Sequence, residues 1–199
     1  MKLKIAFAII ICSLFATASK AQVLNSWKDP SISAQNPVLH KIIVAAAIND
    51  PDIRKQVEDY MASLYPGMAT QSYIIFGIQP LNKDEAAYNQ TLINQGYDGI
   101  VMMQQTSSNV SEHYVQGFPG YYHTWGGYWH NGWSYQPPSP GHVANDYHWY
   151  VQTNAYAVRE NKMVYSVNLE VTDPHGRFNL FRIASDMTRG QMRTDNFLY

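Results

Sequence analysis

The chain has 199 residues, of which 46% are hydrophobic and 15% are charged. This composition is typical of a globular protein with a buried core and excludes a largely disordered chain. Lys and Arg together number 14 against 15 Asp and Glu, and the basic residues form no run. Because no basic patch is available to neutralise phosphates, the sequence predicts no nucleic-acid partner.

Residues 1–21 have the pattern of a secretory signal peptide. Two lysines precede an apolar run at Ile5–Phe15, and small residues follow it before Gln22. The apolar run is about half of the ~20 residues that span a bilayer, so no transmembrane span is predicted. We expect cleavage before Gln22 and export to the periplasm or another part of the bacterial cell envelope.

The only cysteine, Cys12, lies inside this signal sequence. The expected mature chain therefore contains no disulfide, no thiol nucleophile and no thiolate metal ligand. Cys12 also follows three isoleucines in the middle of the apolar run, where lipid attachment is not expected. No cofactor is predicted.

The first folded elements are expected after a flexible leader at residues 22–39. Residues 42–48 form a continuous apolar run, which indicates a strand covered on both faces. A helix is predicted next, with Asp50 as its N-cap, Pro51 at its first position and Pro66 beyond its end.

The same pattern then repeats along the chain. Residues 70–78 read as a second strand, residues 81–96 as a helix with Asn82 as its cap, and residues 98–105 as a third buried strand. The three predicted strands begin roughly thirty residues apart, which is the length of a βαβ unit.

Residues 106–141 lack helical and strand periodicity and are predicted to be an insertion. Residues 147–158 and 163–172 alternate between apolar and polar side chains, which predicts an antiparallel hairpin with one face on the core and one face in water. A helix is expected at residues 179–193. Residues 40–199 are therefore predicted to be one α/β domain, with three helices and a mixed five-stranded sheet of three parallel βαβ strands plus the hairpin.

Familiar catalytic motifs are missing from the sequence. There is no Gly-x-Ser-x-Gly and no Ser-x-x-Lys in the expected mature chain, although a triad assembled from distant residues would leave no such motif. The turn after the first strand contains no glycine, and Asp50 and Asp52 would repel a phosphate, which disfavours nucleotide binding. We expect a protein that is not an enzyme, with an unrecognised hydrolase as one alternative.

The stretch GFPGYYHTWGGYWHNGW, residues 117–133, combines aromatic rings with five glycines and carries no permanent charge. Two interpretations are open: a flap folded over the domain's own apolar surface, or a surface that contacts a protein, a glycan or a membrane. The residues predicted to bind a partner or ligand are Tyr121, Tyr122, Trp125, Tyr128, Trp129, Trp133 and Tyr135.

Five of the seven histidines lie between residues 113 and 148. A glycine-rich segment could bring His123, His130 and His142 around Zn²⁺ or Cu²⁺, although their spacing matches no standard ligand pair. The alternative is that these histidines are polar members of an aromatic cluster. Metal or glycan binding is therefore the second functional hypothesis.

Several of these segments resemble a family of uncharacterised bacterial secreted proteins and lipoproteins, a domain of unknown function with a Tyr/Trp/Gly-rich loop. The resemblance rests on AINDPDIRKQVEDYMASLYPGMATQSYIIF, GYDGIVMMQ, the aromatic segment and FRIASDM, and it covers nearly all of residues 40–190. It implies a location in the cell envelope and assigns no catalytic residue. Many family members carry a lipobox, and this chain departs from them in lacking one.

The predicted architecture is also similar, more distantly, to α/β domains of envelope assembly factors such as the curli-secretion channel subunit and the amino-terminal domain of TolB. The sequence therefore predicts a non-enzymatic envelope protein, a binding or assembly module that contacts another envelope protein or itself through its aromatic segment.

Overall fold

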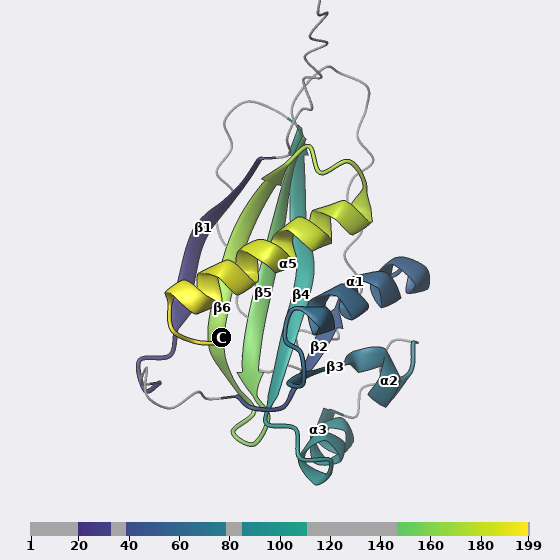
Figure 1. The fold of residues 1–199 in the computed structure, drawn as a ribbon, viewed down its shortest axis with the longest axis vertical. Coiled ribbons are helices and arrows are strands. Elements are labelled where there is room, and N and C mark those ends of the chain that lie inside the picture. The colour runs from purple at the N-terminus through teal and green to yellow at the C-terminus, as the bar shows by residue number, and fades with distance from the viewer. Residues whose placement is uncertain (1–19, 33–38, 79–84, 111–146, 199) are drawn as a thin grey trace, which may run out of the picture.

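The computed structural model describes residues 20–32, 39–78, 85–110 and 147–198. These residues form a mixed six-stranded sheet and four helices (Figure 1). The strands are β1 (Lys20–Lys28), β2 (Ile42–Ala46), β3 (Ala69–Gln71), β4 (Gly99–Val110), β5 (Tyr147–Ala157) and β6 (Lys162–Thr172). The helices are α1 (Pro51–Ser63), α2 (Ser72–Phe76), α3 (Glu85–Asn94) and α5 (Arg177–Thr194). The α/β class is confirmed, with one strand and one helix more than predicted.

The strand order in the sheet is β1-β6-β5-β4-β2-β3. Strand β2 is parallel to both β3 and β4, whereas the pairs β4–β5, β5–β6 and β6–β1 are antiparallel. The predicted parallel strands and the predicted hairpin therefore lie in one continuous sheet.

Helices α1 and α5 cover one face of this sheet (Figure 1). Helix α1 begins as predicted, because the Oδ1 atom of Asp50 accepts hydrogen bonds from the backbone N–H groups of Asp52 and Ile53, each at 3.0 Å. Fully buried apolar side chains from both layers fill the space between them, including Val44, Val167 and Phe181.

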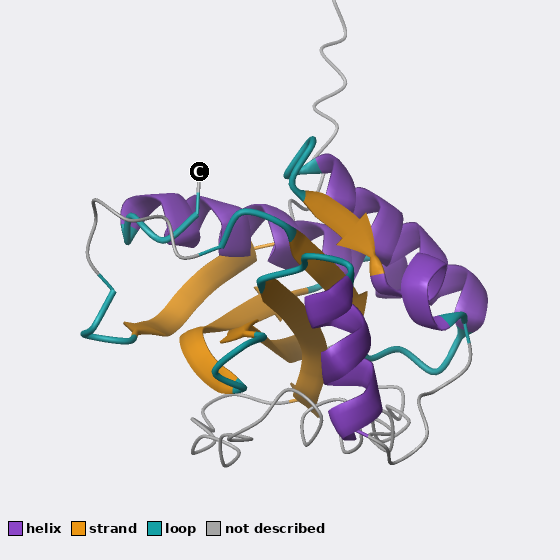
Figure 2. Ribbon diagram, turned by 90° about the horizontal axis from the view of Figure 1, so that it is seen from below, coloured by secondary structure: helices purple, strands orange, loops and turns teal. Residues whose placement is uncertain are grey.

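A smaller apolar cluster lies on the opposite face, so helices are found on both sides of the strands (Figure 2). There Ile43 and Ile100 pack near Leu92 of α3. The rings of Phe76 and Tyr88 meet edge to face, with 5.2 Å between their centroids, and so join α2 to α3. These contacts cover the half of the face that belongs to the parallel strands.

The expected second strand, residues 70–78, is mostly helical. Strand β3 ends at Gln71 and α2 follows at once. The carboxylate of Glu58 accepts hydrogen bonds from the Ser72 hydroxyl and from the backbone N–H of Tyr73. This long-range anchor at the start of α2 overrides the apolar pattern that predicted a strand.

The sixth strand falls where the flexible leader at residues 22–39 was expected. Strand β1 pairs with β6 from Lys20 to Lys28, and the Lys28 Nζ atom donates to the backbone oxygen of Asp195 at 2.6 Å. The predicted cleavage before Gln22 would remove only the first two residues of this strand. Residues 1–19, which carry most of the predicted signal peptide, lie outside the described residues, and none of the described helices is long and apolar enough to cross a membrane.

Two further expectations about the antiparallel half differ from the structure. Strand β4 runs to Val110, so the first residues of the expected insertion at 106–141 belong to the sheet. The outer face of the hairpin is not in water, because Ser166 is 1% exposed and Asn168 is 7% exposed. Alternation separates the two faces of a strand but does not say which of them is covered.

Candidate functional site

A cavity of about 520 Å³ opens at the end of the sheet where β5 begins and β6 passes into α5. We call it the β5–α5 pocket. It is lined by Tyr147 and Trp149 of β5, by the connecting residues 173–177, and by Leu180 of α5. Its volume is within the ~300–1,000 Å³ that small-ligand sites occupy in proteins.

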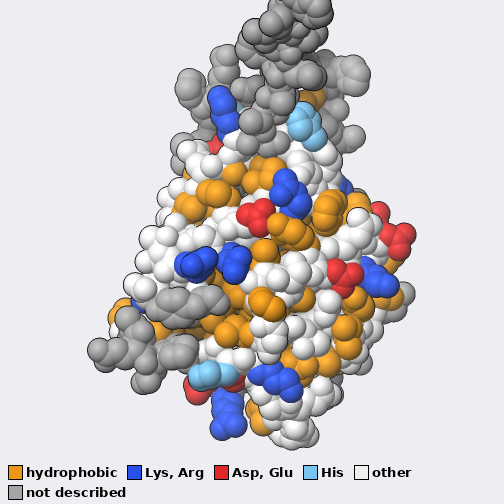
Figure 3. All heavy atoms as spheres, viewed as in Figure 1, with side chains coloured by type: hydrophobic (Ala, Val, Ile, Leu, Met, Phe, Trp, Pro, Cys, Tyr) orange, Lys and Arg blue, Asp and Glu red, His pale blue; other side chains and the backbone are white. Residues whose placement is uncertain are grey.

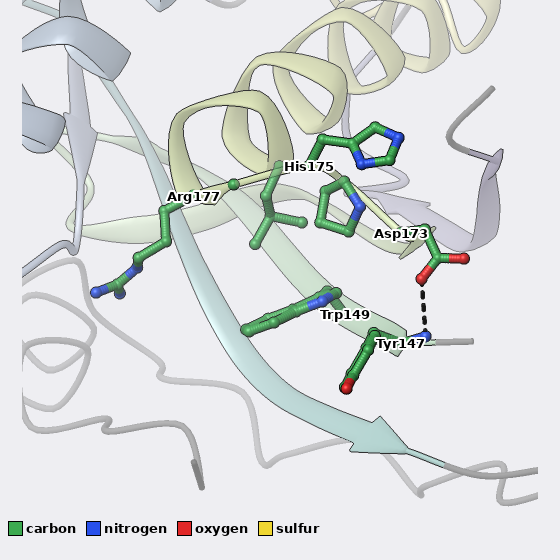
Figure 4. Close-up of a pocket in the computed structure, with 8 residues that line it drawn as sticks. Tyr147, Trp149, Asp173, His175 and Arg177 are labelled. Carbon is green, nitrogen blue, oxygen red and sulfur yellow. Dashed lines mark hydrogen bonds between the residues drawn. The ribbon is translucent and has the colours of Figure 1, made fainter. Parts of the chain in front are cut away.

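Two aromatic rings form one wall of the β5–α5 pocket (Figure 4). Tyr147 and Trp149 are two residues apart on β5, so their side chains project from the same face of the sheet. Both are half-buried, and Trp149 also packs against the main apolar core. A rigid core therefore positions an apolar surface that stays partly open to a ligand.

The opposite wall is a strained turn. Asp173 and His175 have positive φ angles of 50° and 47°, and Gly176 follows with φ 104°. Side chains other than glycine rarely adopt this region, and such strain persists only where surrounding contacts hold it. Two hydrogen bonds to Tyr147, each of 3.0 Å, hold the first of these residues. The Asp173 N–H donates to the Tyr147 carbonyl oxygen. Asp173 Oδ1 accepts from the Tyr147 N–H (Figure 4).

A chain of hydrogen bonds connects this turn to α1. The amide of Asn179 donates to the carbonyl oxygen of Pro174 at 2.6 Å, and the guanidinium of Arg182 donates to Asn179 Oδ1. Asp186, one helical turn further along, accepts from Arg182 and from the hydroxyl of Tyr60 on α1. The hydrogen bond to Asp186 raises the pKa of Tyr60, because the protonated hydroxyl is the form that donates this bond.

Both signs of charge are present at the rim of the pocket. The carboxylate of Asp173 faces β5, whereas the side chain of Arg177 extends away from it on the other side (Figure 4). On the face seen in Figure 3, basic and acidic side chains are interspersed among apolar ones over α1 and α5. The pocket therefore combines an apolar floor with a mixed polar rim.

The crevice that often binds ligands in doubly wound sheets is filled by the chain itself. Strand β2 leads into α1 on one face, and β3 leads into α2 on the other, so the crevice lies beyond the ends of these two strands. The carboxylate of Glu58 occupies that position and accepts from the backbone N–H groups of Ala46 and Tyr73. An internal carboxylate thus accepts the backbone N–H groups that an anionic ligand could otherwise bind there.

The residues predicted as sites all lie outside the described residues. This applies to the aromatic set Tyr121, Tyr122, Trp125, Tyr128, Trp129, Trp133 and Tyr135, and to the metal set His123, His130 and His142. Among the described residues, no three His, Cys, Asp or Glu side chains are grouped closely enough to hold a metal ion. Nδ1 of His148, the described member of the histidine-rich region, lies within hydrogen-bonding distance of the Glu170 carboxylate.

Sequence reasoning did not identify the β5–α5 pocket. Its turn has the sequence Asp-Pro-His-Gly, a cluster of turn-forming residues between a strand and a helix. That cluster was the one sequence signal that could have pointed to the turn. The strand pattern placed Tyr147 and Trp149 on one face but could not show that a strained turn would leave space above them.

No family model matches the chain, and no curated protein matches it. Among solved structures, the chain is similar to a PelC dodecamer from Paraburkholderia phytofirmans, with 10% identity over 84% of this chain and 91% of that chain, at a TM-score of 0.41. A point variant of that dodecamer gives 11% identity, 84% and 92% coverage and a TM-score of 0.42. Likenesses this distant carry no argument about function, which has to come from the site.

Proposed function

We propose that the chain is a non-enzymatic binding or assembly module of the bacterial cell envelope, which holds a partner protein through the β5–α5 pocket and through the aromatic segment, residues 117–133. The observation that carries this proposal is the pairing of Val110 with Tyr147 at the open end of β4 and β5. Residues 111–146 connect Val110 to Tyr147 in the sequence and lie outside the described residues. Tyr147 itself lines the pocket.

Aromatic residues would supply most of the binding free energy at this end of the molecule. Tyr and Trp dominate the energetics of protein interfaces because they bury a large apolar area and keep one polar group for a hydrogen bond. Tyr147 and Trp149 lie in the pocket, and Trp125, Trp129 and Trp133 belong to the segment that joins β4 to β5. Aromatic residues are therefore present both in the pocket and, in sequence, in the connection between β4 and β5.

The polar groups of the pocket support a binding role over a catalytic one. The Asp173 carboxylate accepts from the backbone of Tyr147, and the Pro174 carbonyl oxygen accepts from Asn179. Both groups thereby fix the wall of the pocket, which gives a preformed surface and lowers the entropic cost of binding.

Site-specific photocrosslinking in cells tests this function. A photoreactive amino acid placed at Tyr147 or at Trp129 should crosslink to the same protein, either an envelope component or a second copy of the chain. The matched control position is Ile74 on α2, which is 58% exposed and belongs to a different part of the fold.

Alanine variants complete the test. Tyr147→Ala and the combined change Trp125→Ala, Trp129→Ala and Trp133→Ala should each abolish that crosslink while the urea midpoint of unfolding stays close to the wild type. Different partners at the two positions, or equal crosslinking from Ile74, would contradict the proposal. A large loss of stability in the combined variant would show that the segment is a flap over the domain's own core.

A further inference from the structure

The β5–α5 pocket contains an unpaired positive charge. Arg177, the first residue of α5, is half-buried and lines the pocket. Within the part of the chain that the structure describes, its guanidinium forms no ion pair and no hydrogen bond, and its Nε atom is buried without a partner. Most buried polar side-chain atoms in proteins are hydrogen-bonded, so this atom lacks the acceptor that such a group normally has.

The start of α5 does not compensate this charge. Its N-cap is Gly176, which has no side chain to accept a hydrogen bond, and its first turn contains no acidic residue. A cation at this position lies at the positive end of the helix dipole, which is unfavourable unless an anion is nearby. The next arginine of the helix, Arg182, already donates to Asn179 and Asp186. The charge of Arg177 is therefore left for a group that comes from outside the described residues.

The pocket places this charge beside an apolar slot. The apolar lining is supplied by Tyr147, Trp149, Pro174 and Leu180. Arg177 extends on the side away from Asp173, whose carboxylate lies next to Tyr147 (Figure 4). Asp173 Oδ1 already accepts from the Tyr147 N–H, so this carboxylate belongs to the wall of the pocket. An anionic group of a ligand would meet Arg177 at one end of the slot and would avoid Asp173 at the other.

A ligand can reach the pocket from solvent. The cavity holds about 520 Å³, and His175 and Gly176, which line it, are exposed. The aromatic rings of Tyr147 and Trp149 are half-buried, so part of each ring faces the open space. An aromatic ring that enters the slot would stack on them or meet them edge to face, as aromatic pairs do in protein interfaces.

We propose that the β5–α5 pocket recognises a segment of the partner protein in which an aromatic residue stands next to Asp or Glu. The aromatic ring packs against Trp149, and the carboxylate accepts hydrogen bonds from Arg177, because the planar guanidinium fork matches a carboxylate. Charge complementarity selects this occupant: a purely apolar segment would bury Arg177 without compensation, and a basic segment would repel it. This inference rests on the proposed function, since it names the chemistry of the partner held there.

Calorimetric titration of the purified protein with blocked tetrapeptides tests this chemistry. The probe is Gly-Phe-Glu-Gly, and the comparisons are Gly-Phe-Gln-Gly, Gly-Phe-Lys-Gly and Gly-Ala-Glu-Gly. The probe should bind about tenfold or more tightly than each comparison, which corresponds to about 1.4 kcal/mol. Arg177→Gln should remove the preference for glutamate over glutamine. Arg193→Gln is the matched control and should keep it, because Arg193 is an exposed residue about 24 Å away at the other end of α5.

A charge reversal separates recognition from folding. Arg177→Glu should bind Gly-Phe-Lys-Gly more tightly than Gly-Phe-Glu-Gly, which is a gain that a misfolded protein would not show. Four results would overturn the assignment: no binding of the probe at millimolar concentration, equal affinity for the glutamate and glutamine peptides, a preference that persists in Arg177→Gln, or binding of phenylacetate as tight as that of the probe. The last result would assign the pocket to a small aromatic acid.

Photocrosslinking in cells distinguishes this inference from the proposed function. With the photoreactive amino acid at Tyr147, Arg177→Glu should abolish the crosslink and Arg193→Glu should not. A partner shared by Tyr147 and Trp129 that is still captured in both variants would support the proposed function and reject this partner chemistry. Selective binding of the probe peptide without a shared partner would support this chemistry and contradict the proposed function.

Discussion

The Nε atom of Arg54 lies 2.8 Å from Glu58 Oε1, and neither side chain has any exposed surface. Besides this ion pair, Glu58 accepts from the backbone of β2 and from Ser72, and Arg54 donates to Ser72 at 3.0 Å and to the carbonyl oxygen of Ile78. One buried pair therefore joins α1 to the end of β2 and to both ends of α2. Removing one partner leaves the other charge buried without compensation.

Glu58→Ala is expected to lower the free energy of unfolding by about 3–5 kcal/mol, the range found when one member of a buried ion pair is removed. Urea denaturation followed by circular dichroism measures this loss. Asp59→Ala is the matched control, because Asp59 is exposed and accepts from Gln71 and Tyr73. Its loss should remain near 1 kcal/mol or less. Equal effects of the two changes would contradict the role assigned to the buried pair.

Two glycine substitutions should change stability in opposite directions. A Cβ atom added at Gly99 would lie 2.6 Å from Leu39 Cδ1, whereas one added at Gly190, inside α5, would have no atom within 4 Å. Gly99→Ala is expected to cost about 1–3 kcal/mol through overpacking. Gly190→Ala should stabilise the protein by up to about 1 kcal/mol, since alanine is the better helix former.

Thermal unfolding of the single variants, and of Gly99→Ala combined with Leu39→Ala, tests whether contact with Leu39 causes the loss of stability. Because Leu39 is fully buried and supplies all three of the nearest atoms, the cost of Gly99→Ala should largely disappear once its side chain is shortened. An undiminished cost in that background would show that the glycine is needed for its backbone conformation.

Export should produce a shortened chain. The signal pattern predicts a mature protein that begins at Gln22, and the side chain of Gln22 donates to Glu170 at 2.5 Å, so the remaining strand starts on a paired residue. The intact mass of protein recovered from a bacterial periplasm measures the start. A chain that keeps Met1 would reject export by this route, and a start at Ser19 would place the cleavage before the whole of β1.

The sequence predicted the elements whose signals are local. The apolar run of β2, the Asp50 cap of α1 and the alternation of β5 and β6 each depend on neighbouring residues, and each element formed. Helix α2 depends instead on the distant residue Glu58, and strand β1 depends on its pairing with β6. Single-sequence patterns carry no information about such pairings, and this explains both misassignments.

The candidate sites were harder to predict for the same reason. The β5–α5 pocket needs a turn at residues 173–177 to stand over two side chains of β5, and the grouping of Asn25 with Asn168 needs the register of β1 and β6. From the sequence alone, polar residues such as Asn168 predict a solvent-exposed face of the hairpin. The structure instead pairs Asn168 with Asn25 of β1. A sequence shows which residues have polar or reactive side chains. The order and register of the strands decide which of these side chains lie close together.

Asp29 should make stability depend on pH in the acid range. Its carboxylate is hydrogen-bonded by Lys162 and also accepts from the N–H and hydroxyl of Ser31, which lowers its pKa to about 2. In the unfolded chain an aspartate titrates near 3.9, so the folded state binds this proton less tightly. The contribution is therefore fully present above pH ~4 and is lost as the pH falls toward about 2.

Urea denaturation between pH 2 and pH 6, on the wild type and Asp29→Asn, measures this contribution. The wild type should be the more stable of the two at pH 6, and the difference should shrink steadily below pH ~4 as the unfolded chain begins to take up the proton. Because the Lys162 side chain is more than half exposed, salt should reduce the difference at pH 6 but should not remove the part due to Ser31. A difference that stays constant over this pH range would show that Asp29 acts through the shape of the turn and not through its charge.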